Sequence, residues 1–264
     1  MGIVNLTDDS YFAQSRCTGP EAALSRIGRL LEEGADIIDI GACSTRPGSM
    51  PVGEDEEWQR LKPVLEEVWN AFPGITLSID TYWSSVVRRA FDLAGPFIVN
   101  DISAGEGDPL MLRTVGTLGL QYVAMHMRGT PADMQSMTDY DDVTQEVIRY
   151  FQAFALRAEN AGIKDWILDP GFGFAKTVEQ NWQLLKELES VVLSTRRADG
   201  TRRRCLVGLS RKSMICKPLG ITPDEALPAT QAAHLAALLN GADILRVHDV
   251  REAAQTVAVY RMMA

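Results

Sequence analysis

The sequence predicts an α/β protein folded as a single (β/α)8 barrel, or TIM barrel, with its active site at the C-terminal ends of the strands. Eight strand-like apolar runs alternate with segments of helical period, and no linker interrupts them, so residues 1–264 are expected to form one domain. The length of 264 residues is close to the roughly 250 typical of this fold. A doubly wound sheet is less favoured, because residues 5–9 read Asn-Leu-Thr-Asp-Asp and not a glycine-rich phosphate-binding turn.

The expected strands are short apolar runs, most of which end at a polar residue. The first begins at Gly2, so we expect nothing to cover the bottom of the barrel unless a preceding piece of the chain is missing. The strands are expected at residues 2–6, 37–41, 75–79, 97–99, 122–125, 166–168, 205–209 and 243–247.

Between these strands, apolar residues recur every three or four positions, which is the period of an amphipathic helix. Pro20 is placed to open the first helix and Gly34 to end it. Residues 196–204 are a polar insertion that we interpret as a solvated turn. The helices are expected at residues 20–34, 55–72, 83–94, 109–118, 140–161, 178–193, 223–240 and 250–263.

The composition argues against several classes of protein. The formal net charge of −9 disfavours non-specific nucleic-acid binding, which needs a basic surface. No apolar run of about 18 residues could span a membrane and no signal peptide is visible, so we expect a soluble, cytoplasmic protein. The four cysteines form no CxxC pair and have no metal-like spacing with the three histidines, which favours reduced thiols over a zinc or iron site.

Polar residues stand at or near the C-terminal end of every expected strand. Each alone could be a turn former, a helix cap or a solvated charge. Asp39 lies inside its strand and is interpreted as structural, and His126 is more often a satisfied core histidine than a catalyst. Because the strand ends of a barrel meet at one mouth, so many polar ends favour an active site there. The residues concerned are Asn5, Asp39, Asp80, Asn100, Asp101, His126, Asp169, Ser210, Lys212, Arg246 and His248.

The sixth strand leads into residues 169–174, which read Asp-Pro-Gly-Phe-Gly-Phe. Gly171 and Gly173 can take positive φ values and would let a ligand approach the backbone closely. Asp169 before Pro170 could also simply start a turn, so this motif taken alone fits a turn as well as a site. Its position among other polar strand ends favours the site.

One group of strand ends suits a flat heterocycle. Asp80, Asn100 and Asp169 offer acceptors and an amide to the N–H donors on one edge of such a ring. Lys212 could reach a carbonyl or nitrogen on the other edge.

A second group is basic and suits a phosphorylated ligand. Arg46, Arg211, Arg246 and His248 would supply the local positive field that such a ligand needs against the net charge of −9, although Arg211 could also be a surface charge. The neutral oxygen of Asn5 suits Mg²⁺, which keeps several waters and bridges phosphates.

Motifs distributed over essentially the whole chain resemble those of the dihydropteroate synthases. The motifs around Asp80, Asn100 and Asp169 would fit any pterin-binding barrel, including the methyltetrahydrofolate methyltransferases. The Thr-Arg-Pro loop and the Ser-Arg-Lys-Ser and Arg-Val-His-Asp motifs point to the synthases. The matching stretches are residues 1–7, 44–48, 78–81, 100–102, 125–127, 169–174, 210–213 and 246–249.

This resemblance implies a transferase of folate biosynthesis and a sulfonamide target. The enzyme would condense 6-hydroxymethyl-7,8-dihydropterin diphosphate with p-aminobenzoate to give 7,8-dihydropteroate and pyrophosphate. It would use Mg²⁺, held by Asn5, and would be a homodimer.

The resemblance also implies roles for particular residues. The catalytic residues would be Asp80, Asp169, Lys212, Arg246 and His248. The pterin would be held by Asp80, Asn100, Met125, Asp169, Gly208 and Lys212. The pyrophosphate would be held by Asn5, Arg46, Arg246 and His248. The p-aminobenzoate pocket would consist of Thr45, Pro47, Phe174, Lys212 and Ser213.

The chemistry of that reaction agrees with the residues available. Loss of pyrophosphate would leave a cation delocalised into the dihydropterin, which the carboxylates of Asp80 and Asp169 would stabilise. Mg²⁺ and the basic residues would stabilise the charge on the leaving group. An aryl amine is already a neutral nucleophile near neutral pH, so the reaction needs neither a strong general base nor a covalent residue.

The chain departs from the usual motifs at two positions. Asp8 replaces a proline in the first loop, which removes a fixed φ angle and adds negative charge near the anion site. Cys43 replaces a common glutamate, and either Tyr11 or Phe12 could cover the p-aminobenzoate pocket. A non-catalytic pterin-binding paralogue and a pterin methyltransferase therefore stay open as alternatives.

Overall fold

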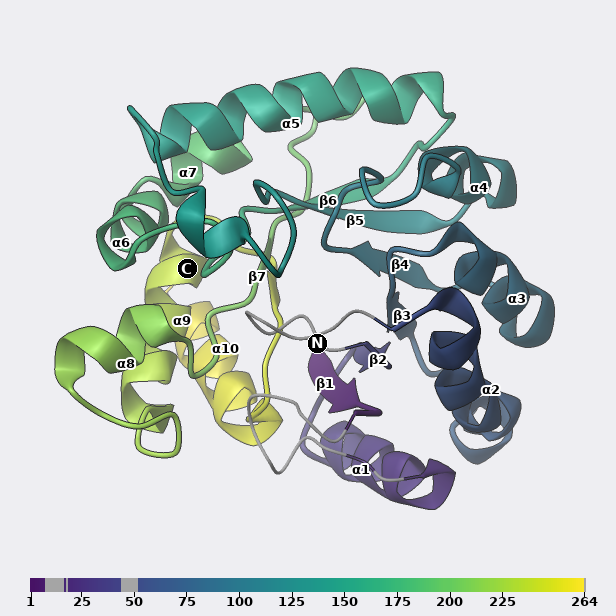
Figure 1. Cartoon of the computed structure of the whole chain (residues 1–264). Helices are drawn as coiled ribbons and strands as arrows, with labels where there is room; N and C mark the ends of the chain where they lie inside the picture. Colours follow the sequence, from purple (N-terminus) through teal and green to yellow (C-terminus); the bar gives the residue numbers. More distant parts are fainter. Residues whose placement is uncertain (8–16, 18, 44–51, 264) are drawn as a thin grey trace.

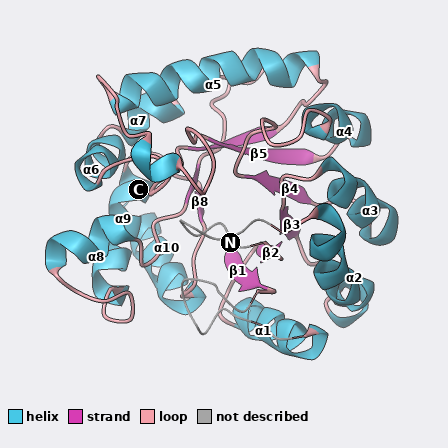
Figure 2. Ribbon diagram, in the orientation of Figure 1, coloured by secondary structure: helices cyan, strands magenta, loops and turns pink. Residues whose placement is uncertain are grey.

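Six parallel strands lie side by side in the order in which they occur in the sequence (Figure 2). The computed structural model describes residues 1–7, 17, 19–43 and 52–263. The register places the last residues of the first three strands in one row with the second-last residue of the fourth, since Asn5 pairs with Gly41, Gly41 with Asp80, and Asp80 with Asn100. The strands are β1 (Gly2–Asn5), β2 (Ile38–Gly41), β3 (Leu77–Asp80), β4 (Ile98–Asp101), β5 (Gln121–Met125) and β6 (Trp166–Asp169).

Two shorter strands complete the ring. β7 (Leu206–Val207) pairs in parallel with β8 (Ile244–Leu245). A parallel bridge between Leu168 and Cys205 joins β6 to the start of β7, and another between Gly2 and Val247 joins the end of β8 to β1. The strands therefore close on themselves, and the predicted eight-stranded barrel is confirmed.

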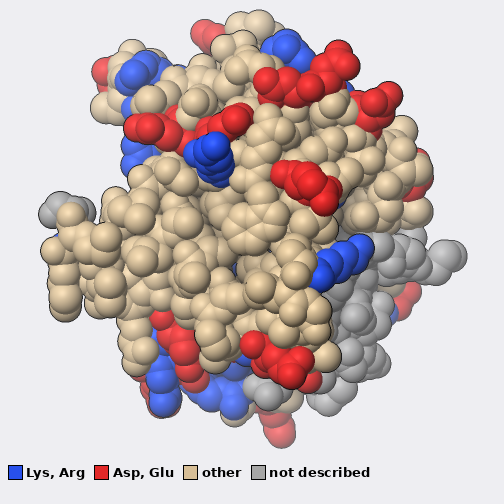
Figure 3. All heavy atoms as spheres, turned by 90° about the vertical axis from the view of Figure 1, so that its left-hand side faces the viewer, with Lys and Arg blue, Asp and Glu red and all other residues tan. Residues whose placement is uncertain are grey.

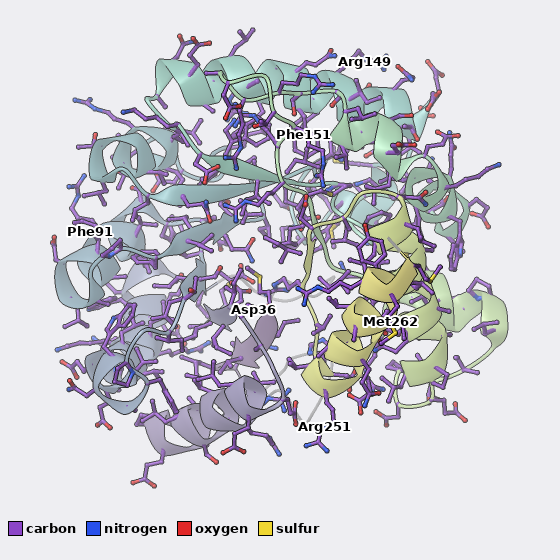
Figure 4. All side chains as sticks on the ribbon, turned by 180° about the vertical axis from the view of Figure 1, so that it is seen from behind. Asp36, Phe91, Arg149, Phe151, Arg251 and Met262 are labelled. Carbon is purple, nitrogen blue, oxygen red and sulfur yellow. The ribbon has the colours of Figure 1, made fainter. Side chains whose placement is uncertain are left out.

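Helices surround the barrel and cover the outer faces of the strands (Figure 1). Their apolar sides pack on the strands, as Phe151 does on α5, while Arg149 of the same helix points away from them (Figure 4). The helices are α1 (Pro20–Glu32), α2 (Glu54–Ala71), α3 (Ser84–Ala94), α4 (Met111–Leu118), α5 (Val143–Asn160), α6 (Val178–Lys186), α7 (Leu188–Val192), α8 (Ser213–Leu219), α9 (Leu227–Leu239) and α10 (Val250–Met263).

The predicted helices need two corrections. The helix expected at residues 178–193 is two helices, because the chain leaves helical geometry at Glu187 between α6 and α7. A further helix, α8, was not predicted, and it is only seven residues long and contains Pro218. In addition, the seventh and eighth strands are two residues long instead of five. These strands are shorter than the apolar runs around them.

The inside of the barrel is divided into an apolar lower half and a polar upper half. Side chains alternate across a strand, so every second residue points inward. Two residues beyond Ile98, Val123, Ile167 and Ile244, towards the C-terminal ends of the strands, the next inward positions are Asn100, Met125, Asp169 and Arg246. The lower cluster consists of Met1, Ile98, Val123, Ile167, Leu206 and Ile244, with Ile37 packed against it.

Met1 belongs to this lower cluster, and its ammonium group donates a hydrogen bond to the Leu245 carbonyl over 3.0 Å. Met1 and Ile37 therefore contribute to filling the bottom of the barrel.

In the described part of the chain, no helix combines the length and the apolar character needed to cross a membrane.

Candidate active site at the barrel mouth

The row of strand ends brings three of the predicted site residues to neighbouring positions. Asn5, Asp80 and Asn100 lie in register, with Gly41 between the first two. A methyl group on Gly41 would lie 3.3 Å from Cβ of Asp80, which is tighter than an ordinary contact. Glycine at this position therefore leaves room for the Asp80 carboxylate.

Arg246 links two carboxylates across the mouth. Its Nε donates to Oδ2 of Asp39 over 2.7 Å, and its Nη2 donates to Oδ2 of Asp80 over 2.8 Å. Asp39 also accepts hydrogen bonds from Ser78 Oγ at 2.5 Å and from Asn100 Nδ2 at 3.2 Å. The interpretation of Asp39 as a structural residue is therefore confirmed, and its role is to orient Arg246 and Asn100.

Asp80 and Asp169 hold their protons more tightly than usual because they are buried. Burial raises the pKa of Asp80 to about 7, although Arg246 opposes that rise. Burial also raises the pKa of Asp169, with Lys212 as the main opposing charge. Burial alone would lower the pKa of Arg246, but Asp39 and Asp80 together raise it above its ordinary value. Arg246 is therefore cationic throughout the physiological range.

The turn after β6 brings Asp169 and Lys212 to the same mouth. Oδ1 of Asp169 accepts a hydrogen bond from the Gly171 amide at 2.8 Å. Nζ of Lys212 donates to the Phe172 carbonyl at 2.5 Å and lies 4.8 Å from the centre of the Phe174 ring. Burial lowers the pKa of Lys212 to about 8, against the opposing effect of Asp169.

Two glycines lie against the Lys212 side chain, and Gly173 makes the closer approach. A methyl group on Gly173 would lie 3.2 Å from Cδ of Lys212, and one on Gly208 would lie 3.8 Å from its Nζ. Met125 is the last residue of β5, is buried, and pairs with Asp169 in the ladder. Ser213 is exposed at the start of α8. Gly208 and Met125 therefore lie close to Lys212 and Asp169 respectively.

Arg211 does not belong to the basic group that the sequence predicted. Its Nε and Nη2 each bond the Asp249 carboxylate at 2.8 Å, and its Nη1 donates to the Pro223 and Asp224 carbonyls. Only 8% of the residue is exposed, so it is not a surface charge either. This bidentate pair fixes the loops that follow β7 and β8.

His248 stands near the mouth as a neutral imidazole. Burial, followed by the nearby Arg246, lowers its pKa to about 3. The expectation that it adds positive charge is therefore wrong, although a neutral imidazole can still exchange hydrogen bonds with a ligand. Its backbone is held on both sides, because its carbonyl accepts from Arg26 at 2.8 Å and its amide donates to Ser210 Oγ at 3.4 Å.

Several predicted residues lie outside the described part of the chain. These residues are Asp8, Tyr11, Phe12, Thr45, Arg46 and Pro47. The described residues of the expected p-aminobenzoate pocket are therefore Phe174, Lys212 and Ser213.

Asn5 fits one kind of magnesium site. Within the described residues, no three His, Cys, Asp or Glu side chains lie together in a way that could hold a metal ion. A Mg²⁺ ion that arrives with substrate phosphates needs only one or two protein oxygens and keeps several waters. Asn5 is the last residue of β1 and pairs with Gly41, which has no side chain. Its single amide oxygen therefore suits a Mg²⁺ ion that arrives with the substrate phosphates.

Lys176 and Glu57 are among the buried ionisable residues that could not be recognised from the sequence. Lys176 is 4% exposed and lies behind the Asp169 turn, where burial lowers its pKa to about 7. Glu57 on α2 is fully buried, and burial raises its pKa to about 7. Nothing in a linear sequence separates such residues from the charged groups that normally face the solvent on a helix or loop.

The chain is similar to proteins of one family. The profile of the family described as "Pterin binding enzyme" matches residues 1–248. The dihydropteroate synthase of Escherichia coli is 38% identical over 261 residues, which cover 98% of this chain and 89% of that protein. The mitochondrial folate synthesis bifunctional protein of Arabidopsis thaliana is 40% identical over 98% of this chain. This chain spans 48% of that plant protein, about half its length.

Solved structures with the same fold carry relevant ligands. The dihydropteroate synthase of Yersinia pestis, in complex with a sulfonamide drug, superimposes with a TM-score of 0.91 at 35% identity, covering 99% of this chain and 92% of that one. The dihydropteroate synthase of Burkholderia cenocepacia, in complex with 7,8-dihydropteroate, gives a TM-score of 0.87 at 36% identity, covering 99% and 90%.

Proposed function

The chain belongs to the pterin binding enzyme family and is a dihydropteroate synthase, and from that premise we propose how its barrel mouth performs the reaction. The mouth takes 6-hydroxymethyl-7,8-dihydropterin diphosphate and p-aminobenzoate, and releases 7,8-dihydropteroate and pyrophosphate. The observation that carries the proposal is the convergence of Asp80, Asn100, Asp169 and Lys212 from four strand ends on one mouth. They provide acceptors for one edge of the pterin and a cation for the other.

The pterin subsite stabilises the positive charge that develops when pyrophosphate leaves. The C–O bond to the diphosphate breaks, and the cation that remains is delocalised into the dihydropterin ring. Asp80 and Asp169 are held in place before the reaction, by Arg246 and by the Gly171 amide respectively. Preorganised carboxylates beside a developing cation are an efficient form of transition-state stabilisation. Asn100 and Met125 orient the ring.

The leaving pyrophosphate is held on the basic side of the mouth. Arg246 supplies its charge there, His248 acts as a neutral hydrogen-bonding group, and Arg46 and Asn5 complete the subsite. When bound at Asn5, Mg²⁺ would neutralise negative charge on the phosphates. The guanidinium of Arg246 balances Asp39 and Asp80 as well as the anion, so it couples the two subsites.

Among the described residues, the second substrate would contact the Phe174 ring, the Lys212 stem and Ser213. Thr45 and Pro47, which the family resemblance assigns to the same pocket, lie outside the described part of the chain. Its neutral aryl amine attacks the CH₂ cation, a C–N bond forms, and the amine loses a proton to solvent. No covalent enzyme intermediate is required.

We also propose that two copies of the chain associate as a homodimer. Residues 227–239 of α9 contain no Asp, Glu, Lys or Arg, and Leu239, Val259 and Met262 on α9 and α10 are exposed. Figure 3 shows a broad area without charged side chains on the side of the molecule where α6, α8 and α9 lie. A second copy is the partner that suits such a surface in a protein with a net charge of −9.

The reaction is proposed to run in the cytoplasm. Cys205 and Cys216 are buried free thiols, as expected in a reducing compartment.

The decisive experiment measures pyrophosphate release from the dihydropterin diphosphate with Mg²⁺, with and without p-aminobenzoate, and identifies the product by mass. Release that depends on p-aminobenzoate and yields dihydropteroate supports the proposal. Release without p-aminobenzoate, giving hydroxymethyl-dihydropterin, would mean that the second subsite does not work. Pterin binding without any release would favour the non-catalytic paralogue, and methyl transfer from methyltetrahydrofolate would favour the methyltransferase.

A further inference from the structure

Lys176 occupies a buried position behind the turn that carries Asp169. Its Nζ lies 3.0 Å from Nδ1 of His126, 3.0 Å from the Gly171 carbonyl and 3.0 Å from the Phe174 carbonyl. The His126 carbonyl lies slightly farther away, at 3.4 Å. We propose that Lys176 is a positioning residue of the reaction, acting through the Asp169 turn on the pterin subsite. This inference rests on the function proposed above.

The three short contacts match the three N–H donors of an ammonium group. Because an ammonium has no acceptor, Nδ1 of His126 must present its lone pair, which makes His126 a neutral imidazole. Burial, with Lys176 as the next cause, lowers the pKa of His126 well below its ordinary value, in agreement with that state. His126 is therefore a satisfied core histidine, as predicted, and its partner is Lys176.

The backbone that Lys176 holds is in an unusual conformation. Gly171, Gly173 and Ala175 have φ values of 70°, 84° and 48°, so three of five consecutive residues are left-handed. Glycine adopts such angles readily, but alanine does so only at a cost. A turn of this kind needs external contacts to stay in one conformation. The ammonium provides them by binding one carbonyl early in the turn and another near its end.

Two of the three charged groups of the proposed pterin subsite, Asp169 and Lys212, depend on this turn. The Gly171 amide orients Asp169, while the Phe172 carbonyl accepts from Lys212. Lys176 binds the carbonyls of Gly171 and Phe174, and the Phe172 carbonyl that binds Lys212 lies between them in the chain. Lys176 also belongs to the positive charges that favour the ionised form of Asp169. Loss of the ammonium should therefore misplace Lys212 and disturb Asp169 together.

The test compares Lys176→Met with the control Lys186→Met, a change at an exposed lysine on α6. Lys176→Met removes the three donors but keeps a flexible apolar stem of similar length. We expect it to weaken binding of the dihydropterin diphosphate at least tenfold by calorimetry, and to lower kcat at saturating substrates at least tenfold. The Lys186→Met protein should match the wild type in both. A folded Lys176→Met protein within twofold of wild type in both would overturn the proposal.

A second pair of variants covers the case in which Lys176→Met does not fold. Asparagine can place an oxygen near the position of Nδ1, whereas leucine cannot, so His126→Asn should retain much more pterin affinity than His126→Leu. A merely structural role would lower the melting temperature of His126→Leu while leaving its pterin affinity and kcat at the wild-type level. Equal pterin affinities of His126→Asn and His126→Leu would overturn the proposal. Failure of the wild type itself to bind or turn over the pterin would instead contradict the proposed function.

Discussion

At the scale of single residues, the proposed chemistry depends on the charge of Asp169. Asp169→Asn keeps a carbonyl oxygen that can still accept from the Gly171 amide at 2.8 Å, so the turn should be preserved. It removes the negative charge that would stabilise the pterin cation. We expect kcat to fall by roughly 10²–10³, as for the loss of a preorganised electrostatic group.

The measurement is steady-state pyrophosphate release, with circular dichroism to establish that the protein is folded. Asp199→Asn, at an exposed turn residue that caps Thr201, is the control and should leave kcat unchanged. Lys212→Ala should also abolish product formation, because it removes the cation beside Phe174. Turnover near the wild-type rate in both site variants would contradict the assignment of residues.

Glu57 makes stability depend on pH in a direction opposite to that of an ordinary ion-paired carboxylate. Burial raises its pKa from 4.5 to about 7, so the folded protein holds the proton more tightly than the unfolded chain. Stability is therefore lost as the pH rises from about 4.5 to about 7 and stays lower above that range. The full loss corresponds to at most about 3 kcal/mol.

Glu57→Gln should remove this loss, because glutamine resembles the protonated acid and carries no charge. Urea unfolding of the variant and the wild type should agree at pH values near 4, and the variant should become more stable by about 2–3 kcal/mol at pH 8. Glu67→Gln, on the exposed side of the same helix, should show no such divergence. A constant difference across the pH range would disprove the titration of Glu57.

Asp80, Asn100 and Asp169 could be placed at the barrel mouth from the sequence, because polar residues at the ends of apolar strands are visible as a pattern. The states of His248 and Arg211 could not be predicted in this way. The charge of His248 depends on burial, and that of Arg211 is neutralised by Asp249, a pairing that only the folded loops create. Lys176 was missed for the same reason, since its three acceptors belong to His126 and to backbone carbonyls.

At the scale of elements, the positions of the strands were predictable but their ends were not. Alternation and apolar content identify a strand, whereas its ends depend on ladder partners in other strands. Residues 205–209 read as a five-residue strand, yet only Leu206 and Val207 pair regularly with β8. Helix α8 shows no helical pattern in the sequence, because it is short and contains Pro218.

The Asp169 turn offers a prediction at this scale. Gly171 has a φ of 70°, and a methyl group on it would lie 2.0 Å from the His126 carbonyl oxygen. Gly119 has a φ of 64°, but a methyl group there would meet no atom within 4 Å. Gly119→Ala should therefore lower the free energy of unfolding only by the cost of the left-handed angle, about 1 kcal/mol. Gly171→Ala should lower it by a further 1–3 kcal/mol, roughly the cost of overpacking, and should also lose most of the pterin affinity.

Urea unfolding measures the two stabilities, and calorimetry measures binding of the dihydropterin diphosphate. The comparison separates backbone strain, which both variants share, from the close approach of the turn to β5, which only Gly171 makes. Equal losses in the two variants, with pterin binding intact, would show that the turn can move away from His126 without consequence.

At the scale of the whole molecule, closure of the barrel brings distant parts of the sequence together. Arg246, close to the C-terminal helix, bonds Asp39 and Asp80 in the first third of the chain because β8 lies beside β1. The fold could be predicted from the alternation of strands and helices. This ion-pair network could not be predicted, because the charged residues Asp39, Asp80 and Arg246 could have paired in several ways.

The proposed homodimer leads to a prediction about the outer surface. Leu239 at the end of α9 is 55% exposed, and Leu156 on α5 is 64% exposed. The two helices lie on different sides of the barrel (Figure 1). A lysine at Leu239 would place a charge in the uncharged surface and, after association, would be buried without a partner, which is strongly unfavourable. A lysine at Leu156 would remain in water.

Sedimentation equilibrium distinguishes these cases, since one chain has a mass of 29.1 kDa. The wild type and Leu156→Lys should sediment as dimers at micromolar concentration, whereas Leu239→Lys should shift towards monomers by at least tenfold in the dissociation constant. The barrel mouth is formed by the strand ends of one chain, so the monomeric variant should keep its pterin affinity. A Leu239→Lys protein that remains dimeric would move the interface away from α9, and a monomeric wild type would remove the proposed dimer altogether.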